Sequence, residues 1–179
     1  AKAAAPIIVF VDEAEKLLGK SEGIHDGGAH DAVLGQFLSF MQEDDSGVFF
    51  VFTANNMEKF APELVDRFEG RYFIDLPSAD ERKEILRIHL KLRNQDVEKF
   101  DMDELVRACK DFSGRNIEDS IEEAMGVAFN DDRPLEMDDL LSTFALVVPT
   151  SKTKKNEIET MRSYVDNGLM RQANYLPEL

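Results

Sequence analysis

The chain has 179 residues, 43% of them hydrophobic, which is enough for one compact domain or two small ones with packed cores. The formal net charge of -15 argues against non-specific binding to nucleic-acid phosphates, because such proteins carry a basic patch or stripe. The longest apolar run is far too short to span a bilayer. Cys109 is the only cysteine and is expected to be a small core residue, so neither an internal disulfide nor a cysteine-based zinc site can form.

The first predicted element is an apolar strand that ends in two carboxylates. The run from Pro6 to Val11 leads directly into Asp12 and Glu13. The carboxyl edge of a parallel sheet is where a nucleotide triphosphatase holds Mg²⁺ and polarises a water molecule. In this interpretation Asp12 holds Mg²⁺, directly or through water, and Glu13 activates the water that attacks the γ-phosphate. In the alternative interpretation the two acids are simply a polar end to the strand.

A polar loop and a helix follow. Residues 16–28 are rich in Gly, Ser and charge, which predicts a loop after a short helical turn. His25 and His30 could suggest a metal pair, but the carboxylates beside them lack a supporting framework. A helix is predicted over residues 31–43, because apolar residues recur at spacings of one, three and four, namely Val33, Leu34, Phe37, Leu38 and Met41.

A second apolar strand is predicted over residues 48–53, and its continuous apolar run is typical of a parallel strand covered on both faces. Asn55 follows this strand, so its amide could position the water or the γ-phosphate. The alternative is an ordinary turn formed by Asn55 and Asn56. A third strand over residues 72–76 stops at Pro77, and the alternation of strands and helices indicates an α/β unit with parallel pairing.

Two arginines precede the third strand. Arg67 lies in the run Pro-Glu-Leu-Val-Asp-Arg-Phe, and Arg71 is the fallback candidate for the same role. An arginine can complete a neighbouring subunit's site by neutralising charge on the transferred phosphoryl group. The alternative is an ion pair of Arg67 with Asp66 or Glu69.

Only helices are predicted beyond Pro77. Ser78 and Glu81 form a capping box, and Ile85, Ile88, His89 and Leu92 follow at helical spacing. Further helices are predicted over residues 102–110, 116–130, 137–145 and 154–165. The inward face of the second of these is expected to carry Ile117, Ile121, Ala124, Met125 and Ala128. Residues 168–179 are expected to fray or to dock on a partner.

Arg115 follows Ser113 and Gly114 at the start of a helix. Its side chain could swing back toward the α/β part and sense phosphate. A solvated arginine in a first helical turn explains the sequence equally well. The pattern predicts three parts: an α/β part over residues 1–77, a helical part over 78–148, and a C-terminal helix and tail over 149–179.

The order of these motifs resembles the C-terminal two-thirds of a AAA+ ATPase module. The resemblance implies part of a P-loop NTPase parallel sheet with helices, followed by an all-helical lid. Within it Asp12 and Glu13 resemble the Walker B element, Asn55 the sensor 1 residue and Arg67 the arginine finger, and Gly114 and Arg115 resemble the start of the sensor 2 helix. Residues 34–43 and 148–153 are most similar to AAA proteins of cyanobacteria and plastids that are named only as a conserved open reading frame.

The phosphate loop of such modules is absent from this sequence, which contains no Gly-x-x-x-x-Gly-Lys-[Ser/Thr] string. Members of the family place that loop and its strand before the position of residue 1, and the strand lies inside the sheet, between the strand of Asn55 and the strand after Arg67. We therefore expect the chain to be a fragment, or another segment to fill the gap. On its own it should show negligible ATP turnover.

The resemblance implies a parent AAA+ ATPase that uses ATP and Mg²⁺ to remodel a macromolecular partner. It implies neighbouring ATPase subunits in a homo-oligomeric ring, such as a hexamer, a protein substrate, no membrane and no nucleic acid, in the cytoplasm or the plastid stroma. A second hypothesis is a non-catalytic half-ATPase that docks on complete subunits and offers Arg67 to them. A third, a clamp-loader-like subunit acting near DNA, has no electrostatic support.

Overall fold

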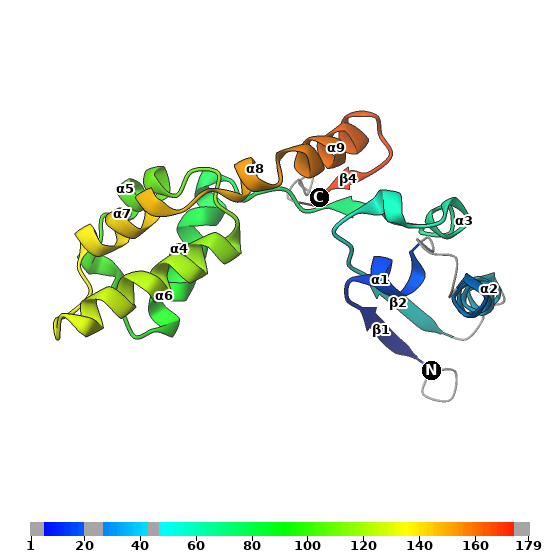
Figure 1. Cartoon of the computed structure of the whole chain (residues 1–179), viewed down its shortest axis with the longest axis horizontal. Coiled ribbons are helices and arrows are strands. Elements are labelled where there is room, and N and C mark those ends of the chain that lie inside the picture. Colours follow the sequence, from blue (N-terminus) through cyan, green and yellow to red (C-terminus); the bar gives the residue numbers. More distant parts are fainter. Residues whose placement is uncertain (1–5, 20–26, 43–46, 174–179) are drawn as a thin grey trace. The chain divides into compact units, whose positions relative to one another are not determined.

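The computed structural model describes residues 6–19, 27–42 and 47–173, and the chain divides into two compact units, Ala1–Arg71 and Tyr72–Leu179 (Figure 1). The described strands form two separate two-stranded parallel sheets, one in each unit. No helix in the described part of the chain is long and apolar enough to cross a membrane. The division into three parts at residues 77 and 148 stays a prediction.

The first unit is built on strands β1 (Ile7–Val11) and β2 (Val48–Phe52), which pair in parallel from Ile7 with Val48 to Val11 with Phe52. Helices α1 (Ala14–Leu18), α2 (Gly27–Gln42) and α3 (Pro62–Val65) and the 3₁₀ turn η2 (Met57–Lys59) complete it. Its small core consists of Ala14, Leu18, Phe60 and Leu64. The predicted strands are therefore confirmed, and the α2 helix begins earlier than the sequence predicts.

One face of this sheet is covered and the other is exposed. On the covered face, the ring of Phe37 from α2 meets the rings of Phe50 and Phe52 edge-on, at 5.3 and 5.7 Å between centroids. On the other face the exposed fractions of Ile8, Phe10 and Phe49 are 69%, 62% and 61%. The prediction that these strands are covered on both faces is wrong for this structure, because α1, α2 and α3 all contribute to one core and leave the second face without one.

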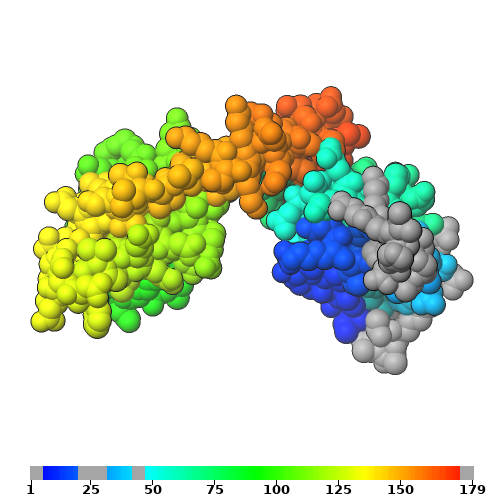
Figure 2. All heavy atoms as spheres, viewed as in Figure 1, coloured from blue at the N-terminus to red at the C-terminus, as the bar shows by residue number. Residues whose placement is uncertain are grey.

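The second unit contains a four-helix lid formed by α4 (Ala79–Leu92), α5 (Met102–Ala108), α6 (Gly114–Asn130) and α7 (Met137–Leu146), with the 3₁₀ turn η3 (Val97–Lys99) between α4 and α5. In the space-filling view the four helices form one continuous block, coloured green to yellow (Figure 2). Its fully buried side chains include Leu86, Leu90, Leu105, Ile117 and Ile121. Cys109 is buried among them, as the sequence predicts.

Two helices bury a different set of residues from the one that their spacing predicts. In α4 the buried residues are Leu86 and Leu90, whereas Ile88 and Leu92 are 45% and 70% exposed. In α2, Val33 is exposed although it belongs to the predicted apolar face. Helix α4 has apolar residues on two sides, so its contacts with α5 and α6 rather than its spacing decide which side is buried.

The chain ends with α8 (Thr150–Thr153), α9 (Lys155–Asp166) and strand β4 (Arg171–Gln172), and β4 pairs in parallel with β3 (Tyr72–Phe73). The prediction of helices alone beyond Pro77 is therefore wrong. Residues 168–173 do not fray, because Met170 is only 8% exposed and Ala173 N donates to Phe73 O at 2.8 Å. Residues 174–179 lie outside the described part.

We call residues 149–173 the C-terminal strap, because polar contacts tie it to two other parts of the second unit. At its start, Thr150 N donates to Asn116 Oδ1 at 3.1 Å, and the hydroxyls of Thr150 and Ser113 lie 3.1 Å apart. Farther along, Arg162 donates two hydrogen bonds to the Asp75 carboxylate, at 2.8 and 2.9 Å. The Asp75 carboxylate raises the pKa of Arg162. The strap therefore connects the start of α6 to the segment after β3.

Candidate functional site

Two polar side chains meet where β1 and β2 end. Because Val11 pairs with Phe52, the next residues, Asp12 and Thr53, leave the sheet at the same edge. The Thr53 hydroxyl donates a hydrogen bond to Asp12 Oδ1 and accepts one from the backbone N–H of Glu13 at 3.1 Å. Thr53 thus holds both acidic residues of the first strand at this edge.

Glu13 adopts a left-handed backbone conformation, with φ of 48° and ψ of 46°. This conformation costs a side-chain-bearing residue about 1–2 kcal/mol, because Cβ approaches the following carbonyl oxygen. Here it turns the chain abruptly from β1 into α1 and leaves the Glu13 side chain 43% exposed. Backbone strain of this kind is concentrated at functional sites, where the geometry of one side chain matters more than local stability.

The described partner of the Glu13 carboxylate is Lys16, one turn along α1, which donates a hydrogen bond to Glu13 Oε2. That contact raises the pKa of Lys16. Both side chains are well exposed, and exposed ion pairs contribute little free energy. Glu13 can therefore exchange Lys16 for another partner at small cost.

Asn55 contacts the buried carboxylate of Glu15 in helix α1. Among its described hydrogen bonds there is none to Asp12 or Glu13. Glu15 Oε1 accepts hydrogen bonds from Asn55 N at 3.2 Å and from Asn55 Nδ2 at 3.4 Å. The neighbouring Asn56 has a different task, since its side chain accepts from Glu58 N at 2.8 Å and caps the following 3₁₀ turn. The two asparagines are therefore not equivalent, and only Asn55 is linked to the acidic segment.

Arg67 follows α3 and is partly buried. In the part of the chain that the structure describes it forms no ion pair with Asp66 or Glu69, and its Nε atom is buried without a hydrogen-bond partner. Its neighbour Phe68 anchors the segment, with its ring 5.2 Å from that of Phe52. The contact of Phe68 thus fixes the segment that carries Arg67, while the Arg67 charge has no ion-pair partner among the described residues.

In the second unit, α6 begins with a capping box. Ser113 Oγ accepts from Asn116 N at 3.2 Å, and Asn116 Oδ1 accepts from Ser113 N at 3.1 Å. Gly114 has ordinary space around it, since an added Cβ would lie 3.8 Å from the Ile85 side chain. Arg115 is 74% exposed and pairs with Asp119 on its own helix, 2.9 Å away. This is the geometry expected of a solvated arginine in a first helical turn.

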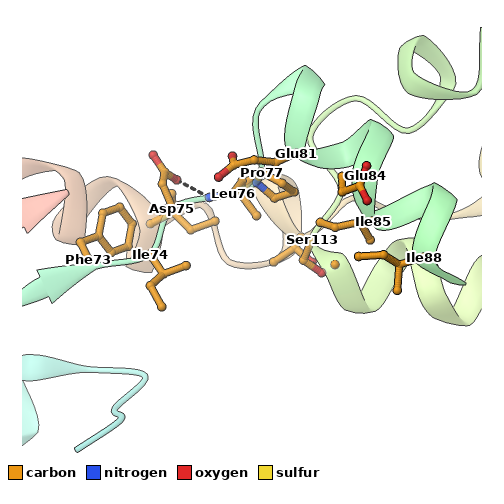
Figure 3. A pocket seen from close by; sticks show the side chains of 13 residues that line it. Phe73, Ile74, Asp75, Leu76, Pro77, Glu81, Glu84, Ile85, Ile88 and Ser113 are labelled. Atoms are coloured by element: carbon orange, nitrogen blue, oxygen red, sulfur yellow. Dashed lines mark hydrogen bonds between the residues drawn. The ribbon is translucent and has the colours of Figure 1, made fainter. Parts of the chain in front are cut away.

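A cavity of about 640 Å³ lies next to this helix start, between the segment after β3 and helix α4. Figure 3 shows Ile74, Asp75 and Leu76 on one side of it and Ile85 and Ile88 on the other. Most of its lining is apolar. The polar groups at its margin belong to Asp75, Glu81, Glu84, Ser113 and Thr150, while Gly114 and Ile158 complete the wall.

No group of three or more His, Cys, Asp or Glu side chains suited to a metal ion occurs among the described residues. His25 lies outside those residues, as does the side chain of His30, so that pair stays untested. Asp12 supplies a single exposed carboxylate beside a hydroxyl. Mg²⁺ is usually bound in this way, by one or two carboxylates together with substrate phosphates and water. The donor set therefore fits Mg²⁺ that arrives with a nucleotide.

Sequence reasoning predicted three residues of this edge, Asp12, Glu13 and Asn55, and missed two, Thr53 and Glu15. Thr53 has no distinctive sequence signal, since a threonine is ordinary at the end of a strand, and Glu15 has only a weak one, since acidic residues are common in a first helical turn. A usable signal for Glu15 is its position three residues after Asp12, because α1 then turns it back toward β2. The residues Asp12, Glu13, Asn55 and Arg67 all lie in the first unit.

An acidic pair follows one strand and an asparagine follows the next, at the carboxyl edge of a parallel sheet, which is where ligands bind in open α/β folds. Residues 1–76 match the family model described as ATPase family associated with various cellular activities (AAA). Residues 1–76 thus resemble part of an AAA ATPase module.

Two relatives of the chain carry the same name. The chain is 36% identical over 177 residues to an uncharacterized AAA domain-containing protein ycf46 of Guillardia theta, and 33% identical over 173 residues to the protein of the same name in Pyropia yezoensis. These alignments cover 97% and 95% of this chain but 35% of each relative. The chain therefore spans about a third of the length of the curated relatives it matches.

The fold agrees with the family match. The crystal structure of the FIGL-1 AAA domain in complex with ADP superimposes with a TM-score of 0.75, covering 93% of this chain and 59% of that chain at 17% identity. At this identity the likeness shows the fold alone, a partial AAA+ α/β fold with its helical lid.

Proposed function

We propose that these residues form the water-activating edge of an ATP-hydrolysing AAA module, whose full-length protein uses the energy of hydrolysis to remodel a protein partner. The single observation that carries the proposal is the arrangement at the ends of β1 and β2, where Thr53 holds Asp12 and fixes Glu13 in a left-handed conformation. This sequence contains no phosphate loop, so the activity is proposed for the full-length protein.

Each residue at the edge has a chemical task in this proposal. The Asp12 carboxylate holds Mg²⁺, and the metal ion, when bound, neutralises charge on the phosphate oxygens. Glu13 accepts a proton from the attacking water, for which an exposed carboxylate on a fixed backbone is suited. The Asn55 amide positions that water or the γ-phosphate.

The cavity of the second unit is suited to the nucleobase. Its lining is mostly apolar, with the aliphatic side chains of Ile85 and Ile88 opposite the segment after β3, and a planar aromatic base would bury its faces there (Figure 3). Gly114 lines the same cavity. We assign Gly114 to nucleotide binding on the same basis. Arg115 does not line the cavity, and its assignment to nucleotide binding rests on its position next to Gly114 and requires it first to release Asp119.

Arg67 acts, in this proposal, on a nucleotide bound to a neighbouring subunit of a homo-oligomeric ring. The support is that its guanidinium group has no ion-pair partner in the described residues, although Asp66 and Glu69 are close in sequence. An arginine that stabilises charge on the transferred phosphoryl group is worth about 10³-fold in rate. Arg71 remains the alternative for this role.

The test is ATP turnover by the full-length protein. Glu13→Gln keeps the shape of the side chain but removes the base, so turnover should fall by about 10²–10⁴-fold while nucleotide and Mg²⁺ binding persist. Glu98→Gln in the lid is the matched control, because it removes one exposed carboxylate far along the chain in η3. Unchanged turnover in Glu13→Gln would refute the assignment of Glu13.

A mixing experiment tests Arg67. Arg67→Ala and Glu13→Gln subunits should each be inactive alone, yet mixed rings should recover part of the turnover, because some interfaces then combine an intact Glu13 with an intact Arg67. No recovery in rings shown to be mixed would count against an action between subunits.

A further inference from the structure

Glu15 is a buried carboxylate that the proposed roles of the neighbouring residues leave unexplained. It lies in the first turn of α1 and is only 8% exposed. Among the residues that the structure describes it forms no ion pair, since Lys16 contacts Glu13 instead. Its Oε2 atom is buried without a hydrogen-bond partner.

A carboxylate in this position is costly. Burying a charged group is unfavourable unless it is paired, and here only one of the two oxygens has donors. An apolar side chain of similar size would pack against the core of the first unit without that penalty. The benefit of the acid must therefore come from the groups that it contacts, and those groups belong to Asn55.

The contacts define the orientation of the Asn55 side chain. An ionised carboxylate only accepts hydrogen bonds, so the Asn55 group facing Glu15 Oε1 must be the Nδ2 end of the side-chain amide and not its carbonyl oxygen. The second bond, from the backbone N of Asn55, fixes the same residue at its main chain. Because Glu15 accepts from both the Nδ2 group and the backbone N–H of Asn55, the Oδ1 atom of Asn55 is left on the other side of the amide, away from Glu15.

We propose that Glu15 is a positioning residue that fixes the amide of Asn55, so that Asn55 presents its oxygen and one remaining N–H to the reacting water. This inference rests on the proposed function and deepens it. Without Glu15 the amide is free to rotate by half a turn and to exchange its donor and acceptor. A misplacement of about 1 Å at a catalytic group can cost about 10²-fold in rate.

The first test uses the 179-residue chain and needs no activity. The Nδ2 proton of Asn55 that faces Glu15 should give an NMR signal downfield of that of a solvated amide. In Glu15→Gln, which preserves shape and packing and keeps an acceptor oxygen, the signal should persist in the folded chain but lie closer to the solvated position, because a neutral acceptor forms a weaker hydrogen bond. In Glu15→Ala it should move to the position of a solvated amide. A signal at the solvated position in the unsubstituted chain, or one unchanged in both variants, would overturn the proposal.

The second test is a double-mutant cycle in the full-length protein. Glu15→Ala should lower kcat by about 10–10²-fold with little change in the KM for ATP, because ground-state binding does not use the amide. If Glu15 acts through Asn55, the double variant Glu15→Ala/Asn55→Ala should be no slower than Asn55→Ala alone. Additive losses would overturn the proposal.

The two tests separate this inference from the proposed function. If Glu13→Gln retains full turnover, the proposed hydrolysis fails, and the NMR comparison of the Glu15 variants still decides whether Glu15 holds Asn55. If Glu13→Gln abolishes turnover and the cycle is additive, hydrolysis stands and the positioning role of Glu15 fails.

Discussion

Replacing Asn116 with alanine tests how firmly the C-terminal strap is attached to the lid. The Asn116 side-chain oxygen accepts from the backbone N–H groups of both Ser113 and Thr150, each at 3.1 Å, and contacts the hydroxyls of the same two residues. One side chain therefore completes the cap of α6 and fastens the start of the strap. Alanine removes both functions and leaves two partly buried donors without a protein acceptor.

The expected loss follows from those contacts. Losing the asparagine half of the capping box costs roughly 0.5–1 kcal/mol, and each N–H group that loses its acceptor costs about 1 kcal/mol where water replaces it incompletely. The backbone N–H of Ser113 is part of the capping box and is also one of the two N–H groups that lose their acceptor, so its loss must not be added twice. We therefore expect the free energy of unfolding of the second unit to fall by about 2 kcal/mol. Asn116→Asp keeps the acceptor oxygens and places a negative charge at a helix start, which is favourable, so it should remain close to wild type.

The chain contains a built-in probe for this measurement. It has no tryptophan, and its three tyrosines, Tyr72, Tyr164 and Tyr175, all lie in the second unit. Urea unfolding followed by tyrosine fluorescence therefore reports on that unit alone. Hydrogen exchange at Ala173, whose amide bonds to Phe73 O at 2.8 Å, reports separately on the far end of the strap. Equal destabilisation by the alanine and aspartate variants, or no effect of alanine on either readout, would refute the reasoning.

Three further predictions concern stability and reactivity. The hydrogen bond from the Arg133 guanidinium lowers the pKa of the Asp139 carboxyl in the folded chain. The stability that this pair adds is therefore present above the ordinary pKa of an aspartate and is lost as the pH falls through the lower pKa of the folded state. The free energy of unfolding of Asp139→Asn should accordingly fall less steeply with acid than that of wild type. Burial raises the pKa of the Cys109 thiol, so a thiol reagent should label it slowly in the folded chain. The labelling rate should rise with urea over the same range in which the tyrosine fluorescence changes. Fast labelling without urea would contradict the burial of Cys109. Leu64 is fully buried, so Leu64→Ala should lower the free energy of unfolding of the first unit by about 2–5 kcal/mol. Phe49 is 61% exposed, so Phe49→Ala should lower it far less. Comparable losses of stability, measured by circular dichroism, would count against the described core.

Local signals predicted most of the helices. Helix α6 is the clearest example, since Ser113 caps it and Ile117, Ile121, Ala124 and Ala128 are all buried, as their spacing indicates. The parallel order of β1 and β2 was likewise predictable, because continuous apolar runs separated by a helix favour it.

Long-range effects could not be predicted in the same way. Strand β4 consists of Arg171 and Gln172, which have no strand pattern, and only their pairing with Tyr72 and Phe73 makes them a strand. In the candidate site, the acidic pair and Asn55 followed from strand ends. The contact of Glu15 with Asn55 did not, because it depends on how α1 packs against the residues after β2.

The pairing of β4 with β3 has a consequence for synthesis of the chain. Tyr72 and Arg171 are about a hundred residues apart, and the lid helices between them make mainly local contacts with one another. A ribosome adds residues at about 5–20 per second, so Tyr72 and Phe73 wait roughly 5–20 s before β4 exists. Closing so long a segment is entropically unfavourable and slow compared with forming the lid. The lid should thus be folded first, and it then holds the two short strands within reach, so that the pairing of β3 with β4 completes the second unit last.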